Sequence, residues 1–337
     1  MGIEKRVRFQ ILTGGLIWVA LLFSSIETGI QRQLAWVVLL AVLVIFPLGL
    51  SLANNFSSLP AIPYQVALFL HPFAAGIVAI SYFLPKGILA VSFAIVLLPF
   101  TFFAAWIGIL RVQKQGWRAI LKTPSEICFA FAPLYLPVGA FWLLMARLGM
   151  EPLGFTEPIV SLTAIHFHFA GFAAPVLCGL VGREILYPAP SNVDFRKSRE
   201  TSFPSPKPLS AAGKAYWLIT GIVISGPALV AVGITFSPLI EAIVGAILAL
   251  GYTGLALLTL GHLRVVQGTL ARVLLGISSL SAMVTMVAAA GFALRTFDLF
   301  PFLSIPQMVV VHGWGNAIGF VLCGFMGWML NQKSAIQ

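Results

Sequence analysis

The amino-acid sequence predicts an all-α fold, a polytopic bundle of about ten transmembrane helices with both the N and C termini in the cytoplasm. Charged residues make up 9% of the 337 positions and hydrophobic residues 59%, and the mean hydropathy is +1.00. A soluble domain carries about 25% charged residues, so a soluble globular protein and a disordered chain are both excluded. The apolar runs are continuous over about 20 residues, whereas barrel strands would alternate over about ten.

Each helix is predicted from one uncharged apolar run, and the turns between the runs hold most of the charged residues. The first run follows Lys5, Arg6 and Arg8 and resembles a secretory signal. Its stretch of about 18 apolar residues exceeds the core of a signal peptide, about 7–15, and no small-residue cleavage site follows, so we expect a retained helix. In chain order the predicted spans cover about 9–26, 33–52, 62–83, 87–109, 125–147, 158–181, 215–235, 238–260, 273–294 and 307–330.

The basic residues predict the side of the membrane on which each turn lies. Of the 20 Lys and Arg residues, 16 fall on one side of the ten spans and 4 on the other. Cytoplasmic turns carry the excess of basic residues, so the larger set marks the cytoplasm, and an even number of spans places both termini there. The smaller set, on the outer side, consists of Arg32, Lys86, Arg147 and Arg295. We expect a multi-pass protein of the cell membrane.

The net charge of +10 does not indicate a nucleic-acid partner, because the basic residues are spread over several segments at helix ends and form no single basic face. The partner that the sequence does predict is the lipid bilayer. Residues 182–214 form the one long polar connection, rich in Pro, Ser and basic residues, and are typical of a flexible tether. They divide one membrane domain into a six-helix part, residues 1–181, and a four-helix part, residues 215–337.

Four of the five histidines fall within predicted spans: His71, His166, His168 and His312. Ionisable groups are costly in hydrocarbon, and those that remain there face the bundle interior and mark functional sites. At a rise of about 1.5 Å per residue, all four lie between the midplane and the outer leaflet, so one shared site is geometrically allowed. The alternative is structural, with each imidazole bonded to a backbone carbonyl.

Small and polar residues recur on the helix faces that carry these histidines. The faces read His312, Gly315, Asn316, Gly319, Cys323 and Gly327 on the last helix, His168, Gly171, Pro175, Gly179 and Gly182 on the sixth, and Tyr64, His71, Ala75 and Tyr82 on the third. A lipid-facing stripe would consist of Leu, Ile, Val and Phe, whereas small residues let helices approach closely. We therefore expect these faces to contact neighbouring helices.

His166 and His168 point about 200° apart on a regular helix, so they cannot hold one ion together. Either one is a ligand while the other bonds a neighbouring helix, or the helix is locally opened. A site for a metal or haem would draw its ligands from separate helices, because neutral imidazole binds zinc, copper and haem iron. The predicted ligands are His71, His168 and His312.

Few other polar residues are predicted near the depth of the histidines. Asn316, on the same helix face as His312, is expected to line a cavity together with the histidines. Glu241, about three residues into the eighth helix, would act as a partner of a metal ligand or as a proton acceptor, or would face water as a helix N-terminal acid. Glu126, at the inner end of the fifth helix, is expected at the interface. The three cysteines lie inside apolar runs and are interpreted as packing residues.

Two segments, Ala164-Ile-His-Phe-His-Phe-Ala-Gly-Phe and Val311-His-Gly-Trp-Gly-Asn-Ala-Ile-Gly-Phe, resemble the YndJ-like family of bacterial multi-pass membrane proteins. The resemblance covers most of the spanning region. It implies a polytopic bacterial membrane protein without an assigned molecular role, sometimes described as transporter-like. A fainter similarity, histidines on several helices followed by small residues, links the chain to the membrane subunits of haem-copper oxidases, although it lacks their adjacent paired histidines.

Three functions are consistent with these residues. The first is an intramembrane histidine site that binds a transition metal or haem for redox chemistry or for a reaction on a lipid-soluble substrate. The second is a secondary transporter for a small molecule, in which the histidines and Asn316 line a cavity and carry protons. The third is a structural or accessory membrane subunit. The sequence has no phosphate loop, G-x-S-x-G elbow or H-E-x-x-H pair, so no soluble-enzyme mechanism is indicated.

Overall fold

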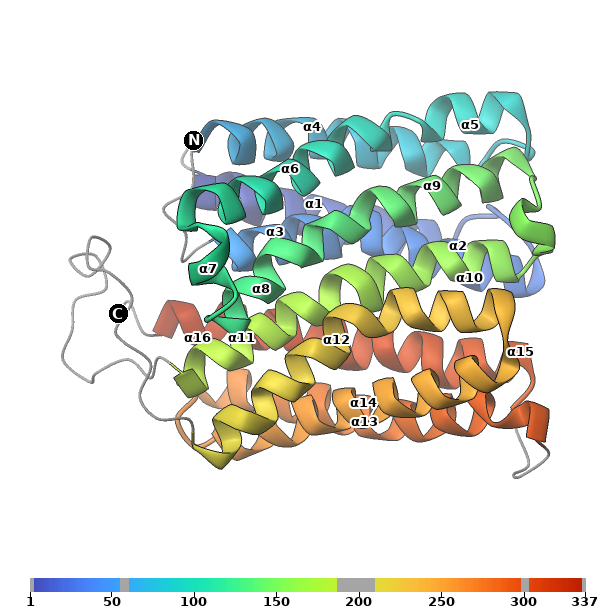
Figure 1. Ribbon diagram of the computed structural model, residues 1–337. Helices are drawn as coiled ribbons and strands as arrows, with labels where there is room; N and C mark the ends of the chain where they lie inside the picture. The colour runs from blue at the N-terminus through green and yellow to red at the C-terminus, as the bar shows by residue number, and fades with distance from the viewer. Residues whose placement is uncertain (1–2, 55–60, 187–209, 298–302, 335–337) are drawn as a thin grey trace.

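The computed structural model describes residues 3–54, 61–186, 210–297 and 303–334. Within these ranges every regular element is helical, and the long helices lie side by side in one bundle (Figure 1). Nine helical runs in the described part of the chain are long and apolar enough to cross a membrane. The predicted all-α, multi-pass bundle is therefore confirmed.

The helices up to residue 186 form the first part of the bundle. They begin with α1 (Ile3–Leu22), then a continuous run of α2 (Gly29–Leu40), η1 (Ala41–Ile45) and α3 (Phe46–Asn54), followed by α4 (Ala61–Ser81) and by α5 (Ile88–Ala94) with α6 (Leu97–Gln115). After the short α7 (Trp117–Ile120), one run contains α8 (Pro124–Phe131), η2 (Ala132–Leu134) and α9 (Tyr135–Leu148). The last run follows the turn η3 (Pro152–Gly154) and contains α10 (Ile159–His166), η4 (Phe167–Ala173) and α11 (Ala174–Leu186).

The helices from residue 211 onward form the second part. They are α12 (Ala211–Phe236), α13 (Pro238–His262), α14 (Thr269–Ala293), the short η6 (Arg295–Phe297), and a run of α15 (Ile305–Met308), η7 (Val309–Leu322) and α16 (Cys323–Ser334). Each of the ten predicted spans overlaps one helical run. The first falls on α1, which is not among the nine apolar runs because Lys5, Arg6 and Arg8 occupy its first turns.

Of the linker predicted at 182–214, residues 182–186 belong to α11, Ser210 precedes α12, and residues 211–214 belong to α12. Residues 187–209 lie outside the described residues. Other helix ends follow local backbone chemistry. Gly149 has a φ of 78° after α9, a left-handed conformation that glycine adopts readily, and the N–H of Met150 bonds the carbonyl of Met145 at 3.0 Å. Pro124 and Pro238 begin α8 and α13, where a proline N–H would have no partner.

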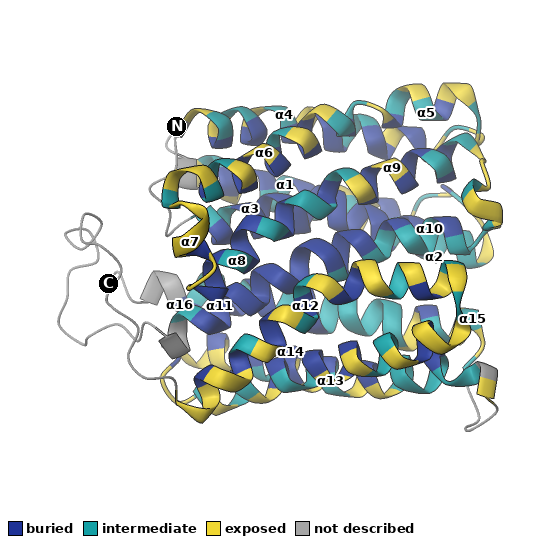
Figure 2. Cartoon of the chain, in the orientation of Figure 1, coloured by how far each residue is buried: buried dark blue, intermediate teal, exposed yellow. Residues whose placement is uncertain are grey.

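Two runs lie at the centre of the bundle. Gly29–Asn54 and Ile159–Arg183 are buried over most of their length, while the other apolar runs are far less buried. Figure 2 shows these central runs largely in dark blue, with exposed residues on peripheral helices such as α4, α5 and α12. A helix that is apolar on all sides and enclosed by neighbours is a central packing element. These two runs carry η1 and η4.

The small-residue faces predicted from the sequence do contact neighbouring helices. On the last run, a Cβ added at Gly315 would lie 2.5 Å from Thr285, and one added at Gly327 would lie 2.7 Å from Leu275, both on α14. On the sixth run, a Cβ at Gly171 would lie 2.7 Å from Tyr135. Real Cβ atoms do not approach so closely, so glycine allows the close packing that a small-residue interface requires.

Candidate functional site

Three π-helical segments meet inside the bundle. They are η1, η4 and η7, each of which interrupts a membrane-length run, and each contacts the other two. The helices that lead into them, α2, α10 and α15, begin at the same end of the molecule, on the right in Figure 1. Single π turns are uncommon and occur frequently at functional sites. We therefore take the meeting of η1, η4 and η7, with the histidines around it, as the candidate site.

Side chains from other helices bond the backbone of each π segment. The imidazole of His71 donates from Nε2 to the carbonyl of Val42 in η1 at 2.8 Å. The hydroxyl of Tyr252 donates to the carbonyl of Ala170 in η4 at 3.2 Å. The hydroxyl of Ser278 donates to the carbonyl of Phe320 in η7 at 2.6 Å. A change of winding interrupts the regular i→i−4 ladder, and buried carbonyls need donors, so these side chains stabilise the local opening.

His168 and His71 occupy a fully enclosed aromatic layer. The ring of His168 lies 4.9 Å from that of Phe46, and the ring of His71 lies 5.2 Å from that of Phe100. Phe46 and Phe100 stack on each other at 5.8 Å, so the two phenyl rings lie between the two imidazoles. Both histidines are buried, His168 completely and His71 to within 2%.

His168 has no hydrogen-bond partner on either ring nitrogen, and His71 has none on Nδ1, among the residues that the structure describes. The His168 ring lies against the backbone of Gly139, where an added Cβ would lie 2.5 Å from Nε2. A buried polar atom without a partner costs about 1–3 kcal/mol, and such atoms are rare in folded proteins. Within the described residues, no hydrogen bond therefore compensates the burial of the two His168 ring nitrogens.

His166 and His312 form a second group, which is only partly buried. His166 donates from Nε2 to the carbonyl of Pro227 at 3.0 Å, inside α12. His312 donates from Nδ1 to the carbonyl of Thr285 at 3.0 Å, inside α14. Asn316 donates its amide to the carbonyl of His312 at 2.7 Å and accepts a hydrogen bond from the Thr285 hydroxyl at 3.0 Å.

The tautomers follow from these bonds, because a carbonyl oxygen can only accept. His166 therefore carries its proton on Nε2 and His312 on Nδ1, which leaves one acceptor nitrogen on each ring. His166 bonds the carbonyl of Pro227 and His168 contacts Phe46, so the two rings have different neighbours. The helix changes its winding between them, where η4 begins at Phe167.

The structure does not bring His71, His168 and His312 together as metal ligands. No group of three His, Cys, Asp or Glu side chains in the described ranges is arranged to hold a metal ion. His71 and His168 lie in the enclosed layer, whereas His312 bonds Thr285 and Asn316. Glu241 is also apart from the histidines. Its carboxylate bonds Arg295 at 2.7 and 3.3 Å.

Two charge networks, one of them buried, were not recognised from the sequence. Their basic residues served there only to predict topology. At one end of the bundle, Glu126 bonds Arg111 at 2.6 Å and Arg183 at 2.9 Å, and its side chain is only 4% exposed. Gln115 adds a third bond to this carboxylate at 2.8 Å, and Arg111 also bonds the carbonyl of Ala53 at 2.8 Å. The signal in the sequence was Glu126 itself, a carboxylate at the start of an apolar run.

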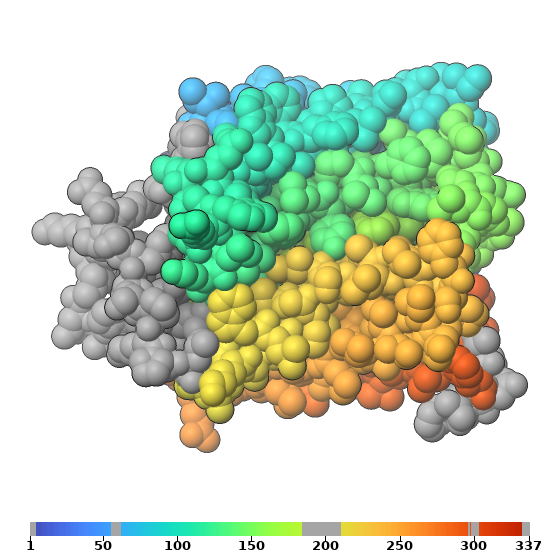
Figure 3. All heavy atoms as spheres, in the orientation of Figure 1, coloured from blue at the N-terminus to red at the C-terminus, as the bar shows by residue number. Residues whose placement is uncertain are grey.

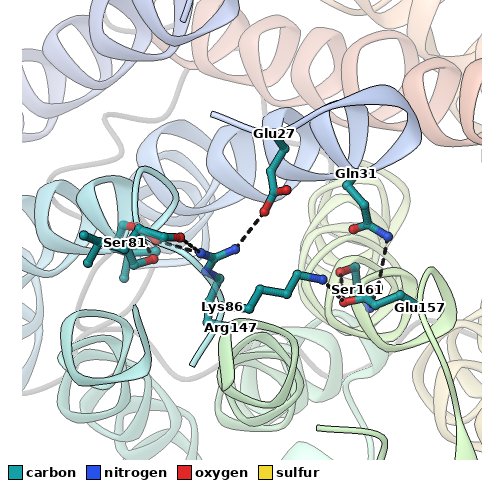
Figure 4. A network of polar contacts seen from close by, with 9 residues as sticks. Glu27, Gln31, Ser81, Lys86, Arg147, Glu157 and Ser161 are labelled. Atoms are coloured by element: carbon teal, nitrogen blue, oxygen red, sulfur yellow. Dashed lines mark hydrogen bonds and ion pairs between the residues drawn. The ribbon is translucent and has the colours of Figure 1, made fainter. Parts of the chain in front are cut away.

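The second network lies at the end where α2 and α10 begin (Figure 4). Arg147, at the end of α9, bonds Glu27 at 3.0 Å and the carbonyls of Ser81 and Leu84 at 2.8 and 2.7 Å. Its guanidinium lies 4.6 Å from the ring centre of Tyr82. Burial raises the pKa of the Tyr82 phenol well above its usual range, and the positive charge of Arg147 opposes this shift.

Beside Arg147, a second ion pair completes this network. Lys86 bonds Glu157 at 3.0 Å, and the carboxylate of Glu157 also accepts from the Ser161 hydroxyl at 2.9 Å and from the Gln31 amide at 3.5 Å. Figure 4 shows the two pairs side by side, Arg147 with Glu27 and Lys86 with Glu157. These bonds join the start of α2, the α4–α5 turn, the end of α9 and the start of α10.

A helical bundle whose described residues contain nine apolar runs of membrane-spanning length, and whose interior holds histidines, defines a multi-pass integral membrane protein. Residues 36–320 match the YndJ-like protein family, and the chain belongs to that family, as the two histidine segments had indicated. The uncharacterized membrane protein YndJ of Bacillus subtilis (strain 168) is 29% identical over 240 residues, which cover 71% of this chain and 38% of that protein. The chain therefore spans well under half the length of that relative. No solved structure matches the chain.

Proposed function

We propose that the protein is a secondary transporter for a small polar solute, with a polar pathway beside η4 and η7 and with protons carried by His166 and His312. One observation supports this most. Two partly buried imidazoles and Asn316 come from helices in both parts of the chain, on or beside η4 and η7, and these two π segments contact each other. Ionisable residues inside spans mark ion pathways and proton relays in transporters.

The chemistry of this group suits proton exchange. Each imidazole donates one proton to a backbone carbonyl and keeps an acceptor nitrogen, so each ring can take up a second proton. One added proton on either ring is enough for such a relay. The amide and hydroxyl of Asn316 and Thr285 add neutral hydrogen-bonding groups, which suit a polar solute.

A labelling experiment tests whether water reaches this pathway. In a background where Cys128, Cys178 and Cys323 are replaced by alanine, Asn316→Cys is treated with a membrane-impermeant thiol reagent in vesicles. The matched control is Val284→Cys. Val284 precedes Thr285 on α14 and is 64% exposed, on the lipid side of the helix. Thiolate formation needs water, so we expect Asn316→Cys to react on the order of tenfold faster. Equal rates, or no reaction from either side of the membrane, would contradict a polar pathway.

A flux experiment tests the role of the histidines. Purified protein is reconstituted into vesicles that contain a trapped pH dye, and protons are driven by a potassium diffusion potential. Wild-type vesicles are expected to acidify faster than protein-free vesicles, and His166→Gln and His312→Gln are each expected to remove most of this excess. His262→Gln is the control, because His262 bonds the carbonyl of Leu258 at the end of α13. A wild-type flux equal to that of empty vesicles would refute proton transport.

The same proposal includes a ten-span topology with both termini in the cytoplasm and a tether between a six-helix and a four-helix part. It is supported by α1, whose 20 residues pack against η1, α2, α3 and α4, and by the unequal distribution of basic residues. Fusion of a fluorescent protein and, separately, of alkaline phosphatase to the C terminus tests it. A fluorescent first fusion and an inactive second fusion are expected. The reverse result would place the C terminus outside.

One observation favours a second candidate function, the binding of a transition metal or haem. His168 has both ring nitrogens buried without partners, and His71 has one, so both rings have lone pairs or protons that no protein group satisfies. A bound metal or haem would supply redox or Lewis-acid chemistry, with His168 as its ligand; the rings of Phe46 and Phe100 lie between His168 and His71, so the two imidazoles would not share one metal atom. The absorption spectrum and metal content of detergent-purified protein, compared with His168→Ala, test this. A metal-free, colourless wild-type protein would refute it.

A further inference from the structure

A groove of about 320 Å³ lies between α12 and α13, apart from the histidines. Its walls are formed by Trp217, Gly221, Ser225 and Leu229 of α12 and by Ile247 and Leu248 of α13, among others. α12 lies at the surface of the molecule, where Figure 3 shows its atoms in yellow. The groove is within two membrane-length apolar helices, so it opens toward the hydrocarbon of the bilayer.

Small residues on α12 create this groove. A Cβ added at Gly221 would meet no atom within 4 Å, so the space above this glycine is open. A Cβ added at Gly226 would lie 2.5 Å from Leu248, so close packing there forms the floor. The Ser225 hydroxyl donates to the carbonyl of Gly221 at 2.7 Å. Because this hydroxyl is already bonded, the groove suits an apolar occupant.

The length of the groove matches one leaflet. Trp217 and Leu229 are twelve residues apart on α12, which corresponds to about 18 Å of helix. Half of the hydrocarbon core measures about 15 Å. An acyl chain that lies along α12 from the headgroup level to the midplane would therefore fill the groove. Trp217, with its amphipathic ring, lies at the end where a headgroup would begin.

Two exposed cations lie at that same end. Lys214 is one turn before Leu218 on the groove face of α12, and it is exposed. Arg264 is exposed two residues beyond the end of α13. α13 follows α12 after a single residue, Ser237, and packs against it, so the start of α12 and the end of α13 lie together. Basic residues at the membrane surface attract anionic headgroups.

We propose that one anionic glycerophospholipid binds here, with an acyl chain in the groove between α12 and α13 and its phosphate beside Lys214 and Arg264. The groove selects for a chain, because its lining is apolar, and the two cations select for a negative headgroup. The site is independent of the proposed transport pathway, because none of its lining residues contributes a hydrogen bond to the histidine group.

Native mass spectrometry of the detergent-purified protein tests this, with phosphatidylglycerol and phosphatidylcholine of identical chains as probes. Each basic residue near a membrane surface contributes about fivefold in affinity, so we expect phosphatidylglycerol to bind on the order of 10-fold more tightly. Lys214→Ala/Arg264→Ala should lose this preference and still bind both lipids weakly. Arg118→Ala/Lys122→Ala, two exposed cations elsewhere, should keep it.

Filling the groove tests the acyl chain. Gly221→Phe should abolish binding of the single lipid. Gly76→Phe is the matched control, because a Cβ at Gly76 on α4 also meets no atom within 4 Å. If Gly221→Phe does not fold, Ser225→Leu serves the same purpose at the next turn. Equal affinity for the two lipids in the wild-type protein, or equal binding by Gly221→Phe and Gly76→Phe, would overturn the proposal.

Discussion

Replacing Glu126 by glutamine removes the carboxylate that bonds both Arg111 and Arg183. The pair with Arg111 is almost fully enclosed, with side chains 1% and 4% exposed. Removal of one partner from a buried ion pair costs about 3–5 kcal/mol, because the remaining charge is left without compensation in a medium of low dielectric constant. Here two guanidinium groups lose that compensation, and Gln115 loses a charged acceptor. We expect Glu126→Gln to fall at the upper end of this range.

The matched control is Glu157→Gln, which removes the same charge from a pair that water reaches. The side chains of Lys86 and Glu157 are 30% and 24% exposed, and pairs at such positions contribute about 0–1 kcal/mol. The free energy of unfolding of both variants is measured in mixed micelles by titration with SDS. The difference between them is expected to be at least about 2 kcal/mol.

A third variant separates loss of compensation from loss of packing. Glu126→Gln/Arg111→Met removes one of the two uncompensated cations along with the carboxylate, so it should recover part of the stability lost in Glu126→Gln. If Glu126→Gln is no less stable than Glu157→Gln, the reasoning from burial is refuted. If the double variant is less stable by the sum of two independent losses, the argument from charge is wrong.

Three further perturbations test other parts of the structure. Gly139→Ala places a Cβ 2.5 Å from Nε2 of His168, so it should destabilise the fold by about 1–3 kcal/mol. The double variant Gly139→Ala/His168→Ala should recover part of this stability, measured by the same SDS titration. Gly315→Val adds atoms where a Cβ alone would lie 2.5 Å from Thr285, so it should lower the unfolding temperature. The control is Gly291→Val, at an open position on α14, which should leave the unfolding temperature nearly unchanged. Burial raises the pKa of the Tyr82 phenol. The stability that the neutral phenol contributes is therefore complete below the unfolded pKa of about 10 and is lost as the pH rises above it. Tyr82→Phe should lose less stability than the wild type between about pH 9 and pH 11, and an unchanged alkaline profile would contradict this assignment.

The sequence predicted the helices well because the signal for each is local. The uncharged run at 158–181, for example, matches the helical run that begins at Ile159 and continues into α11. A segment of that length and hydropathy has few alternatives in a bilayer, since a helix satisfies all of its backbone groups internally. The glycine faces were also predictable, because close helix packing requires small residues at a fixed spacing. Gly315 and Gly327 do contact α14 in this way.

The candidate site was predicted only in part. The sequence identified the histidines as the ionisable groups inside the spans, but it could not tell which would share a neighbourhood. His71 and His168 lie with Phe46 and Phe100, whereas His312 bonds Thr285 and Asn316. The π segments carry no distinct pattern in the sequence, because α and π winding use the same apolar residues.

The sequence by itself determined that this chain is an all-helical membrane protein, where its spans lie, and which few residues stay polar inside them. These properties depend on the transfer of each segment from water to lipid, which is a sum over neighbouring residues. Only the tertiary structure decided the partners of the polar groups, such as Glu126 between Arg111 and Arg183, or Glu241 with Arg295. In hydrocarbon an isolated charge is costly, so each polar group must find a partner, and the arrangement of the helices in space selects that partner.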